Sequence, residues 1–382
     1  MRGHFAAVPA VLAVQGASFA QAGDLEISTQ AGVDALVWED DLGDSATQLA
    51  AEVRGAAVWR DFGAALSTGW VTTEYTSDVD ALNGDVSTPL DTRLLLEWTP
   101  GAFDIQSLPV TVSADLDLNA PTGQNQLAGA EKNAALDPLL SIYDRFGEGF
   151  NAGAGAFISV EPMEGLALGF GLKHAWTGEY EPDGDAPETV LDPADITALN
   201  VQATWSGPAV IATLGAQVYD PGVVTRNGEN LFDQALTTEL NGGAVLKLSP
   251  TLQLQAGGFY STRGADTRLN EITGAFVEEE ERLNGDVWGA DLTLSRLQAP
   301  LGEVRVLAAY VNAGASEFED TLFEYRPERD RYEIGVGLYR DLGPAAIDLE
   351  LVYFRWTDKG SALLTELAAD GLRFGISLER TW

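Results

Sequence analysis

The stretch GLALGFGLKHAW, residues 165–176, alternates between large apolar side chains and small or charged ones. One set of alternate positions carries Leu166, Leu168, Phe170, Leu172 and Trp176. The set between them carries Ala167, Gly169, Gly171, Lys173 and Ala175. Successive side chains of a β-strand point to opposite faces, whereas those of a helix meet every three or four residues. The alternation therefore predicts a strand with one apolar face and one polar, narrow face.

The same alternation recurs along the chain in segments of about ten residues, which is typical of membrane-spanning strands. We predict sixteen strands, at residues 24–38, 47–60, 64–77, 88–98, 108–118, 150–161, 165–177, 195–206, 209–219, 234–248, 251–262, 286–297, 302–313, 329–340, 345–357 and 370–382.

The connections between these segments alternate in length. Seven are short and rich in Gly or Pro, such as RDLGPA at 340–345, and eight are longer and polar, such as residues 39–46 and 119–149. An even number of antiparallel strands with both ends at one rim requires this rhythm. The predicted fold is therefore all-β: a transmembrane antiparallel barrel with short periplasmic turns and long extracellular loops. The competing interpretation is a soluble β-sandwich, whose connections need not alternate in length.

Composition limits the classes of function. The 382 residues include 58 acidic and 22 basic side chains, a formal net charge of −36, which argues against nucleic acid as a partner. The 45% hydrophobic content argues against a disordered acidic chain. Cysteine is absent from the sequence, so no disulfide or Cys-based metal site is expected.

The first residues resemble a secretory signal. Arg2 precedes the apolar run FAAVPAVLAV, and Ala20-Gln21-Ala22 fits a small-x-small cleavage site. We therefore expect a signal peptide at 1–22, cleavage near Ala22/Gly23, and one transmembrane barrel domain at 23–382. The mature sequence has no apolar run of about 18 residues, so no transmembrane helix is expected.

Seven tryptophans lie near predicted strand ends, where membrane barrels carry aromatic girdles. They are Trp38, Trp59, Trp70, Trp98, Trp176, Trp205 and Trp356.

Together, the leader, the sixteen segments, the loop rhythm and the terminal aromatic residue resemble Gram-negative outer-membrane porins. The resemblance implies residence in the outer membrane among lipid and lipopolysaccharide, passive passage of small solutes, and a homotrimer. In that family the last strand is recognised by the barrel-assembly machinery. The residues that fit this signal are Phe374, Ile376, Leu378 and Trp382.

A second resemblance is confined to LDLNAPTGQ at 116–124. It looks like the PTG segment of putative outer-membrane transporters associated with aromatic-compound degradation. Pro-Thr-Gly is equally a favourable turn sequence.

The longest connection, 119–149, is the third long loop. Its apolar side chains need a surface to pack on, and a loop this long is usually functional or disordered. In sixteen-stranded porins the third loop folds inward and narrows the pore. By that resemblance the constriction acids would be Glu131, Asp137, Asp144 and Glu148. A lid across the barrel mouth is the alternative.

The polar faces of the strands supply candidate pore-lining charges. By alternation, the acids Asp115, Asp117, Asp348 and Glu350 face the lumen with the bases Arg54, Arg93 and Arg373. We expect the arginines to lie opposite the loop acids. A wall with an excess of carboxylates favours cations. The outward small residues Ala31, Ala35, Ala51, Gly55 and Ala57 would permit close subunit contact or face lipid.

Enzyme activity is not predicted. His174 is the one histidine outside the leader, and no phosphate-binding, zinc or haem motif occurs in the sequence, so no cofactor or metal is expected. The predicted function is a porin for small hydrophilic solutes, biased toward cations. Two alternatives remain: a substrate-specific transporter for hydrophobic or aromatic compounds, and a structural or adhesive barrel with acidic partner-binding loops.

Overall fold

The computed structural model describes residues 25–270, 275–298, 300–322, 325–362 and 365–382. The expected signal peptide lies outside the described residues.

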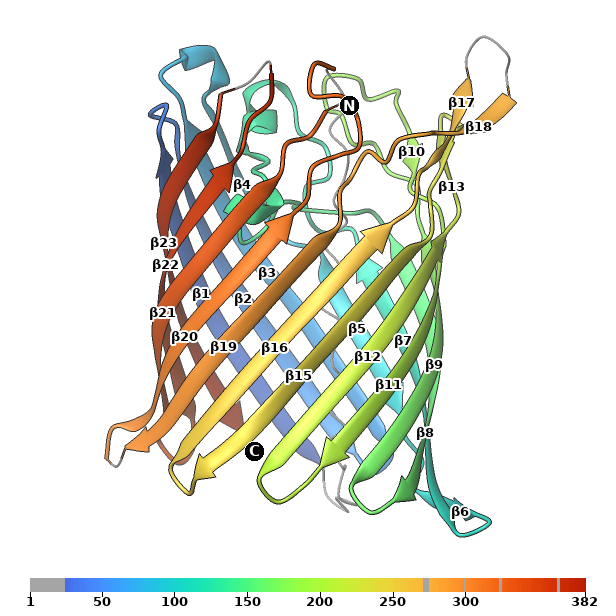
Figure 1. The fold of residues 1–382 in the computed structure, drawn as a ribbon, viewed down its shortest axis with the longest axis vertical. Coiled ribbons are helices and arrows are strands. Elements are labelled where there is room, and N and C mark those ends of the chain that lie inside the picture. Colours follow the sequence, from blue (N-terminus) through green and yellow to red (C-terminus); the bar gives the residue numbers. More distant parts are fainter. Residues whose placement is uncertain (1–24, 271–274, 299, 323–324, 363–364) are drawn as a thin grey trace.

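A single antiparallel sheet closes on itself into a barrel (Figure 1). The sheet has eighteen strand segments in the described chain. Two of them, β4 and β5, are consecutive pieces of one full-length barrel strand, or stave, that pairs with β3, and β6 is a short addition to β7. Subtracting these two extra pieces leaves sixteen staves, as predicted. Pairing of β1 with β23 closes the barrel and sets Ser28 opposite Thr381, so both ends of the sheet meet at one rim.

The staves agree with the predicted segments to within a few residues. Their bounds are β1 Glu26–Asp40, β2 Ser45–Trp59, β3 Phe62–Thr76, β4 Gly84–Pro89, β5 Thr92–Trp98, β6 Phe103–Ile105, β7 Leu108–Ala120, β8 Asn151–Met163, β9 Leu166–Thr177, β11 Ile196–Ser206, β12 Val210–Pro221, β15 Thr237–Ser249, β16 Leu252–Arg263, β19 Val287–Gln298, β20 Gly302–Ala313, β21 Arg329–Asp341, β22 Ala346–Asp358 and β23 Leu367–Thr381.

The long connections carry structure of their own. One 3₁₀ turn, η1 (Asp80–Leu82), precedes β4. A small antiparallel sheet projects from the long-loop rim and is built from β10 Leu191–Asp192, β13 Val223–Arg226, β14 Glu229–Asp233, β17 Thr267–Asn270 and β18 Ala275–Glu278 (Figure 1). None of the described helices is long and apolar enough to cross a membrane.

The first connection was predicted to be long, and this is wrong. Pairing of β1 with β2 continues to Glu39 and Ser45, which leaves a turn of residues 41–44. The Asp40 carboxylate accepts hydrogen bonds from the amides of Leu42 and Asp44, each at 2.9 Å. Gly43 takes a φ of 88°, which favours glycine. This local hydrogen bonding tightens a polar segment that otherwise resembles a loop.

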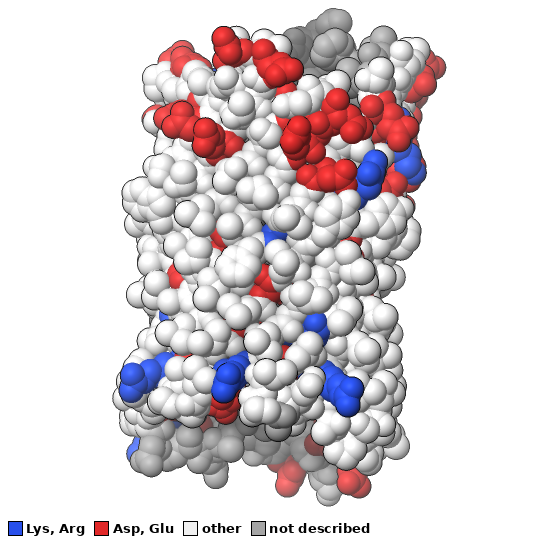
Figure 2. Space-filling model, turned by 90° about the vertical axis from the view of Figure 1, so that its left-hand side faces the viewer, with Lys and Arg blue, Asp and Glu red and all other residues white. Residues whose placement is uncertain are grey.

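Side chains alternate between the two surfaces of the sheet as the sequence predicts. On β1 and β2 the outward Val37, Leu49 and Val53 are 43%, 49% and 55% exposed, whereas the inward Leu36, Gln48 and Ala50 are almost fully buried. Exposed apolar side chains on a closed barrel need lipid around them. Figure 2 shows the corresponding pale band between an acidic rim and a rim that carries basic residues.

Two of the seven predicted girdle tryptophans are misplaced. Trp38 and Trp356 point inward and are 7% and 5% exposed. Both lie under a loop that packs inside the barrel, which sequence position near a strand end does not reveal. The other five are 43% to 50% exposed on the described surface.

Assembly should depend on the last residue. The Trp382 amide donates to the Ile27 carbonyl at 2.8 Å, and the Arg380 guanidinium lies 4.7 Å from the Trp382 ring centroid. Because its ring is exposed at the closing seam, we expect Trp382→Ala to lower the yield of assembled barrel without changing the ion selectivity of barrels that do form. Heat-modifiable mobility on gels measures the yield. Trp382→Phe is the control, and normal assembly of Trp382→Ala would contradict the expectation.

Candidate functional site: the barrel lumen and its inward loop

The connection from residue 121 to residue 150 packs against the inner wall of the barrel. It contains two short 3₁₀ turns, η2 Gly129–Ala134 and η3 Pro138–Leu140. Two apolar clusters hold it. The first joins loop residues Leu136 and Leu140 to inward side chains of β1, β2, β22 and β23, namely Leu36, Trp38, Ala46, Phe354, Trp356 and Ala369.

The second cluster joins the loop to the neighbouring wall. Ala134 and Phe146 of the loop pack with the inward residues Ala50, Val71 and Val86, and with Leu90. Each fully buried large apolar side chain contributes about 1.5–3 kcal/mol. Partly exposed ion pairs contribute about 0–1 kcal/mol. Apolar packing therefore holds the loop on the wall from β22 round to β4, and the charged contacts mainly orient it.

Gln48 fixes the middle of the loop. Its side chain is fully buried. The Oε1 atom accepts hydrogen bonds from the amides of Ile142 at 2.7 Å and Tyr143 at 2.8 Å. The Nε2 group donates to the Tyr143 carbonyl at 2.9 Å and to Thr73 Oγ1 at 2.8 Å. One amide on β2 thus satisfies three backbone groups of the loop that would otherwise be buried without partners.

Asp91 holds the two ends of the loop together. Its Oδ1 accepts from the Gly123 amide at 2.8 Å, and its Oδ2 accepts from the Glu148 amide at 2.8 Å and from Asn119 Nδ2 at 2.7 Å. Asp91 lies between β4 and β5, where the fourth stave is interrupted. The interruption places this carboxylate where it reaches both ends of the loop.

The far side of the loop meets arginines of β21. Arg329 is ion-paired with Asp137, and Arg331 donates to the Leu139 carbonyl. The Arg331 guanidinium also stacks 4.2 Å from the Phe354 ring centroid and pairs with Glu333 at 2.7 Å. The loop therefore contacts β21 as well as the strands on either side of the β1–β23 seam.

The predicted loop acids have different surroundings. Glu131 accepts from the Ala128 amide and Gln124 Nε2, so it caps η2 within the loop. Asp137 is paired with Arg329. Asp144 is half-buried in the loop. Glu148 lies 4.0 Å from Arg93 and 3.7 Å from Arg145. Arg93 is thus the one predicted arginine with an ion pair to a loop acid in the described structure.

The predicted wall charges form ion pairs between adjacent strands or across one intervening strand. Lys173 of β9 lies 3.2 Å from Asp115 and also pairs with Asp117, both on β7. Asp348 pairs with Arg305 of β20. Arg373 pairs with Glu350 at 2.8 Å rather than with a loop acid.

Arg54 is exposed on the inner face of β2. The described wall therefore carries ion pairs along β20 to β23, and it places Lys173 of β9 beside two carboxylates of β7.

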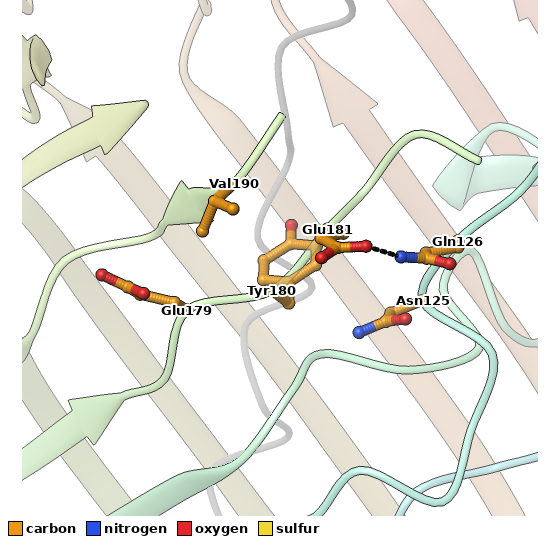
Figure 3. A pocket seen from close by; sticks show the side chains of 6 residues that line it. All are labelled: Asn125, Gln126, Glu179, Tyr180, Glu181 and Val190. Carbon is orange, nitrogen blue, oxygen red and sulfur yellow. Dashed lines mark hydrogen bonds between the residues drawn. The ribbon is translucent and has the colours of Figure 1, made fainter. Parts of the chain in front are cut away.

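At the long-loop rim, the inward loop meets the connection between β9 and β11. Lys132 pairs with Asp185 at 2.8 Å and with Asp183. Its hydrogen bonds hold the pKa of both carboxyls below their usual range. A cavity of about 450 Å³ lies beside this contact, lined by Asn125, Gln126, Glu179, Tyr180, Glu181 and Val190. Figure 3 shows Gln126 hydrogen-bonded to Glu181 across it. The two loops thus form a polar vestibule.

Sequence reasoning missed four residues that hold the loop: Gln48, Asp91, Arg329 and Arg331. Alternation with Glu333 places both arginines on the inner face, so their orientation was available from the sequence. The roles of Gln48 and Asp91 depend on contacts across about 30 to 95 positions, which no local pattern specifies.

A closed barrel of sixteen staves with an apolar outer surface and a polar inner wall has the architecture of an outer-membrane β-barrel protein. No family model matches the sequence, and no curated protein matches it. Solved structures resemble it in architecture. An outer-membrane channel from Pseudomonas putida F1 is 14% identical, with 75% of this chain and 94% of that chain covered and a TM-score of 0.43.

Two further barrels are similar over nearly the whole chain. OccAB4 of Acinetobacter baumannii is 10% identical, with 94% of this chain and 98% of that chain covered and a TM-score of 0.48. OpdK of Pseudomonas aeruginosa, solved with vanillate, is 12% identical, with 93% and 99% covered and a TM-score of 0.43. These likenesses concern architecture, and no substrate for this chain follows from them.

Gln48→Leu tests the attachment of the loop. Leucine keeps the volume but leaves the amides of Ile142 and Tyr143 without a partner, each at a cost of about 1–3 kcal/mol. We expect tryptic cleavage after Lys132 or Arg145, in barrels folded in detergent, to accelerate at least about tenfold because cleavage follows loop opening. Mass spectrometry of the fragments measures the rate.

Gln30→Leu is the matched control, because Gln30 is an inward glutamine of β1 whose side chain is exposed. Equal cleavage rates in wild type and Gln48→Leu would show that Gln48 does not hold the loop.

Proposed function

We propose that this protein is a solute-selective outer-membrane channel, in which small hydrophilic molecules cross between the inward loop and the uncovered part of the barrel wall. One observation carries the proposal: residues 121–150 are packed on the inner wall by two apolar clusters and fixed by Gln48 and Asp91. A sixteen-strand barrel without such a loop leaves a wide aqueous lumen. A fixed loop narrows that lumen and brings solutes close to particular side chains.

We further propose a bias toward cations. Inward carboxylates of the wall include Asp34, Glu52, Asp115, Asp117 and Glu239. Asp115 and Asp117 share Lys173, whereas the other three form no ion pair with a base in the described residues. The long loops add EPDGD at 181–185 and VEEEE at 277–281. Figure 2 shows acidic side chains gathered at the long-loop rim on the face in view. Such a rim raises the local concentration of cations at low salt.

The aromatic-compound transporter is the second candidate. It requires apolar surface in contact with the passage. The loop covers Leu36, Phe354 and Trp356, whereas the inward Phe259 of β16 is 43% exposed. Vanillate, which is named with the OpdK structure, is a suitable aromatic test solute. A structural or adhesive barrel differs from both because it predicts no solute flux.

Removal of the loop tests the narrowing. We expect a barrel in which residues 125–147 are replaced by a short Gly-Ser linker to show a single-channel conductance roughly twofold or more above wild type, because conductance grows with the open cross-section. Planar bilayers in potassium chloride give the measurement. The control replaces only residues 181–185 by the same linker, and an unchanged conductance of the 125–147 deletion would contradict the narrowing role.

Charge selectivity gives a separate test. In Asp115→Asn/Asp117→Asn, Lys173 loses both partners and the wall loses two negative charges. We expect the reversal potential in a salt gradient to move toward that of an anion-preferring pore. Glu39→Gln removes an outward acid and serves as the control. A wild-type pore that strongly prefers anions would refute the cation bias.

A further inference from the structure

One sector of the lumen wall is almost free of charge. β11 contains no acidic or basic side chain, and β12 contains only Asp220, which alternation places on the outer face. Across the barrel, β20 to β23 carry inward Arg305, Arg331 and Arg373. In barrel order β12 is the ninth stave and β1 the first, so the neutral sector faces the half of the wall that the loop covers.

Four carboxamides lie together on the inner face of β11, β12 and the adjacent strand β15. The register sets Asn200 directly opposite Gln217, and sets Gln202 opposite Gly215, which in turn faces Asn241. Their outward neighbours Val201, Leu214 and Leu240 are 49%, 66% and 48% exposed, as lipid-facing side chains should be. The Asn241 amide lies over Gly215, because a Cβ there would fall 2.5 Å from Asn241 Oδ1. Asn241 therefore extends toward Gln202 and makes the four amides one patch.

These amides have hydrogen-bonding capacity that the described protein does not use. Asn200 Oδ1 and Gln217 Oε1 are both covered by neighbouring atoms, yet neither has a hydrogen-bond partner in the described residues. Gln202 Nε2 donates to Thr204 Oγ1 at 3.1 Å, which fixes the orientation of that amide. Covered polar groups in native proteins are nearly always paired, so these two oxygens keep acceptor capacity that the described side chains leave unused.

Two phenylalanines flank the patch. Phe157 of β8 and Phe259 of β16 both point inward, and a Cβ at Gly169 or Gly289 would overlap the Phe157 or the Phe259 ring, respectively. Each ring therefore extends across a glycine of the next strand, which leaves room for it beside the wall. Phe259 is 43% exposed although it faces the passage. An exposed phenyl ring in an aqueous lumen costs free energy unless solutes contact it.

We infer that this neutral patch binds a neutral polyhydroxylated solute of the saccharide class during its passage. Each carboxamide offers both donors and an acceptor, which matches vicinal hydroxyl groups that also donate and accept. The electron-rich ring faces suit the C–H face of a sugar ring. β11 and β12 themselves present no inward charge, and the nearest inward carboxylate, Glu239 of β15, lies opposite Gln217. The inference rests on the proposed channel function and names its solute class.

The test uses the full barrel in planar bilayers and in liposomes. Glucose and maltose are added while single-channel potassium current is recorded, and liposome swelling compares glucose with gluconate, a charged compound of similar size. We expect concentration-dependent interruption of the current by the sugars, and faster entry of glucose than of gluconate.

Variants then locate the binding. In Asn200→Leu/Gln217→Leu the half-blocking sugar concentration should rise about fivefold or more, from the loss of hydrogen bonds to the solute. Phe259→Ala should have a similar effect through lost stacking. If Phe259→Ala does not assemble, the amide variant alone tests whether the patch binds the sugar. Gln30→Leu, an inward amide outside the patch, should leave the sugar response unchanged.

The possible failures are distinguishable. A wild-type barrel that conducts ions but shows no response to sugars, or that is blocked by vanillate and not by sugars, overturns the saccharide inference and leaves the channel function standing. Equal sugar block in wild type and in the amide variant also overturns it. A barrel without any ion conductance overturns both proposals.

Discussion

Hydrogen bonding between β1 and β23 closes the sheet, and every other feature of the molecule depends on that closure. In hydrocarbon no water is available to satisfy an exposed strand edge, so an open sheet could not cross a membrane. Closure fixes an inside and an outside for every strand. It also brings Leu36, Trp38 and Ala369 together on one inner surface, where the loop packs. The β1–β23 pairing therefore both closes the barrel and forms part of the inner surface on which the loop packs.

The inner wall divides into two halves with different chemistry. From β20 through β23, inward charges pair between adjacent strands or across one intervening strand, and the loop covers the adjacent wall as far as β4. Across the lumen, β11 and β12 present carboxamides and hydroxyls without charge. Paired charges lose part of their pull on a passing ion, because each already interacts with its partner. The lumen thus lies between a charged, loop-bearing half and a neutral, hydrogen-bonding half.

Glycine shapes this wall by leaving room for larger neighbours. The Phe157 ring lies over Gly169 and Gly171, and Phe354 lies over Gly371. Asn241 occupies the space beside Gly215 in the same way. Each glycine lets a large inward side chain lie along the wall instead of projecting into the passage. The small residues that made the alternation of residues 165–176 visible in the sequence therefore also determine how far the large inward side chains project into the lumen.

The sequence by itself determined the staves, their inward and outward faces and the rhythm of connections, because strand periodicity is a local property and lipid demands it at every position. The same alternation predicts inward positions for Asp115, Lys173 and Arg373. Only the tertiary structure decided which charges meet, that Arg373 pairs with Glu350, and that Trp38 and Trp356 are buried inside instead of lying in the girdle. Those outcomes depend on where the loop of residues 121–150 packs. Its position is set by contacts between positions far apart in the chain, such as Gln48 with Tyr143 and Arg329 with Asp137, which become neighbours only when the barrel closes.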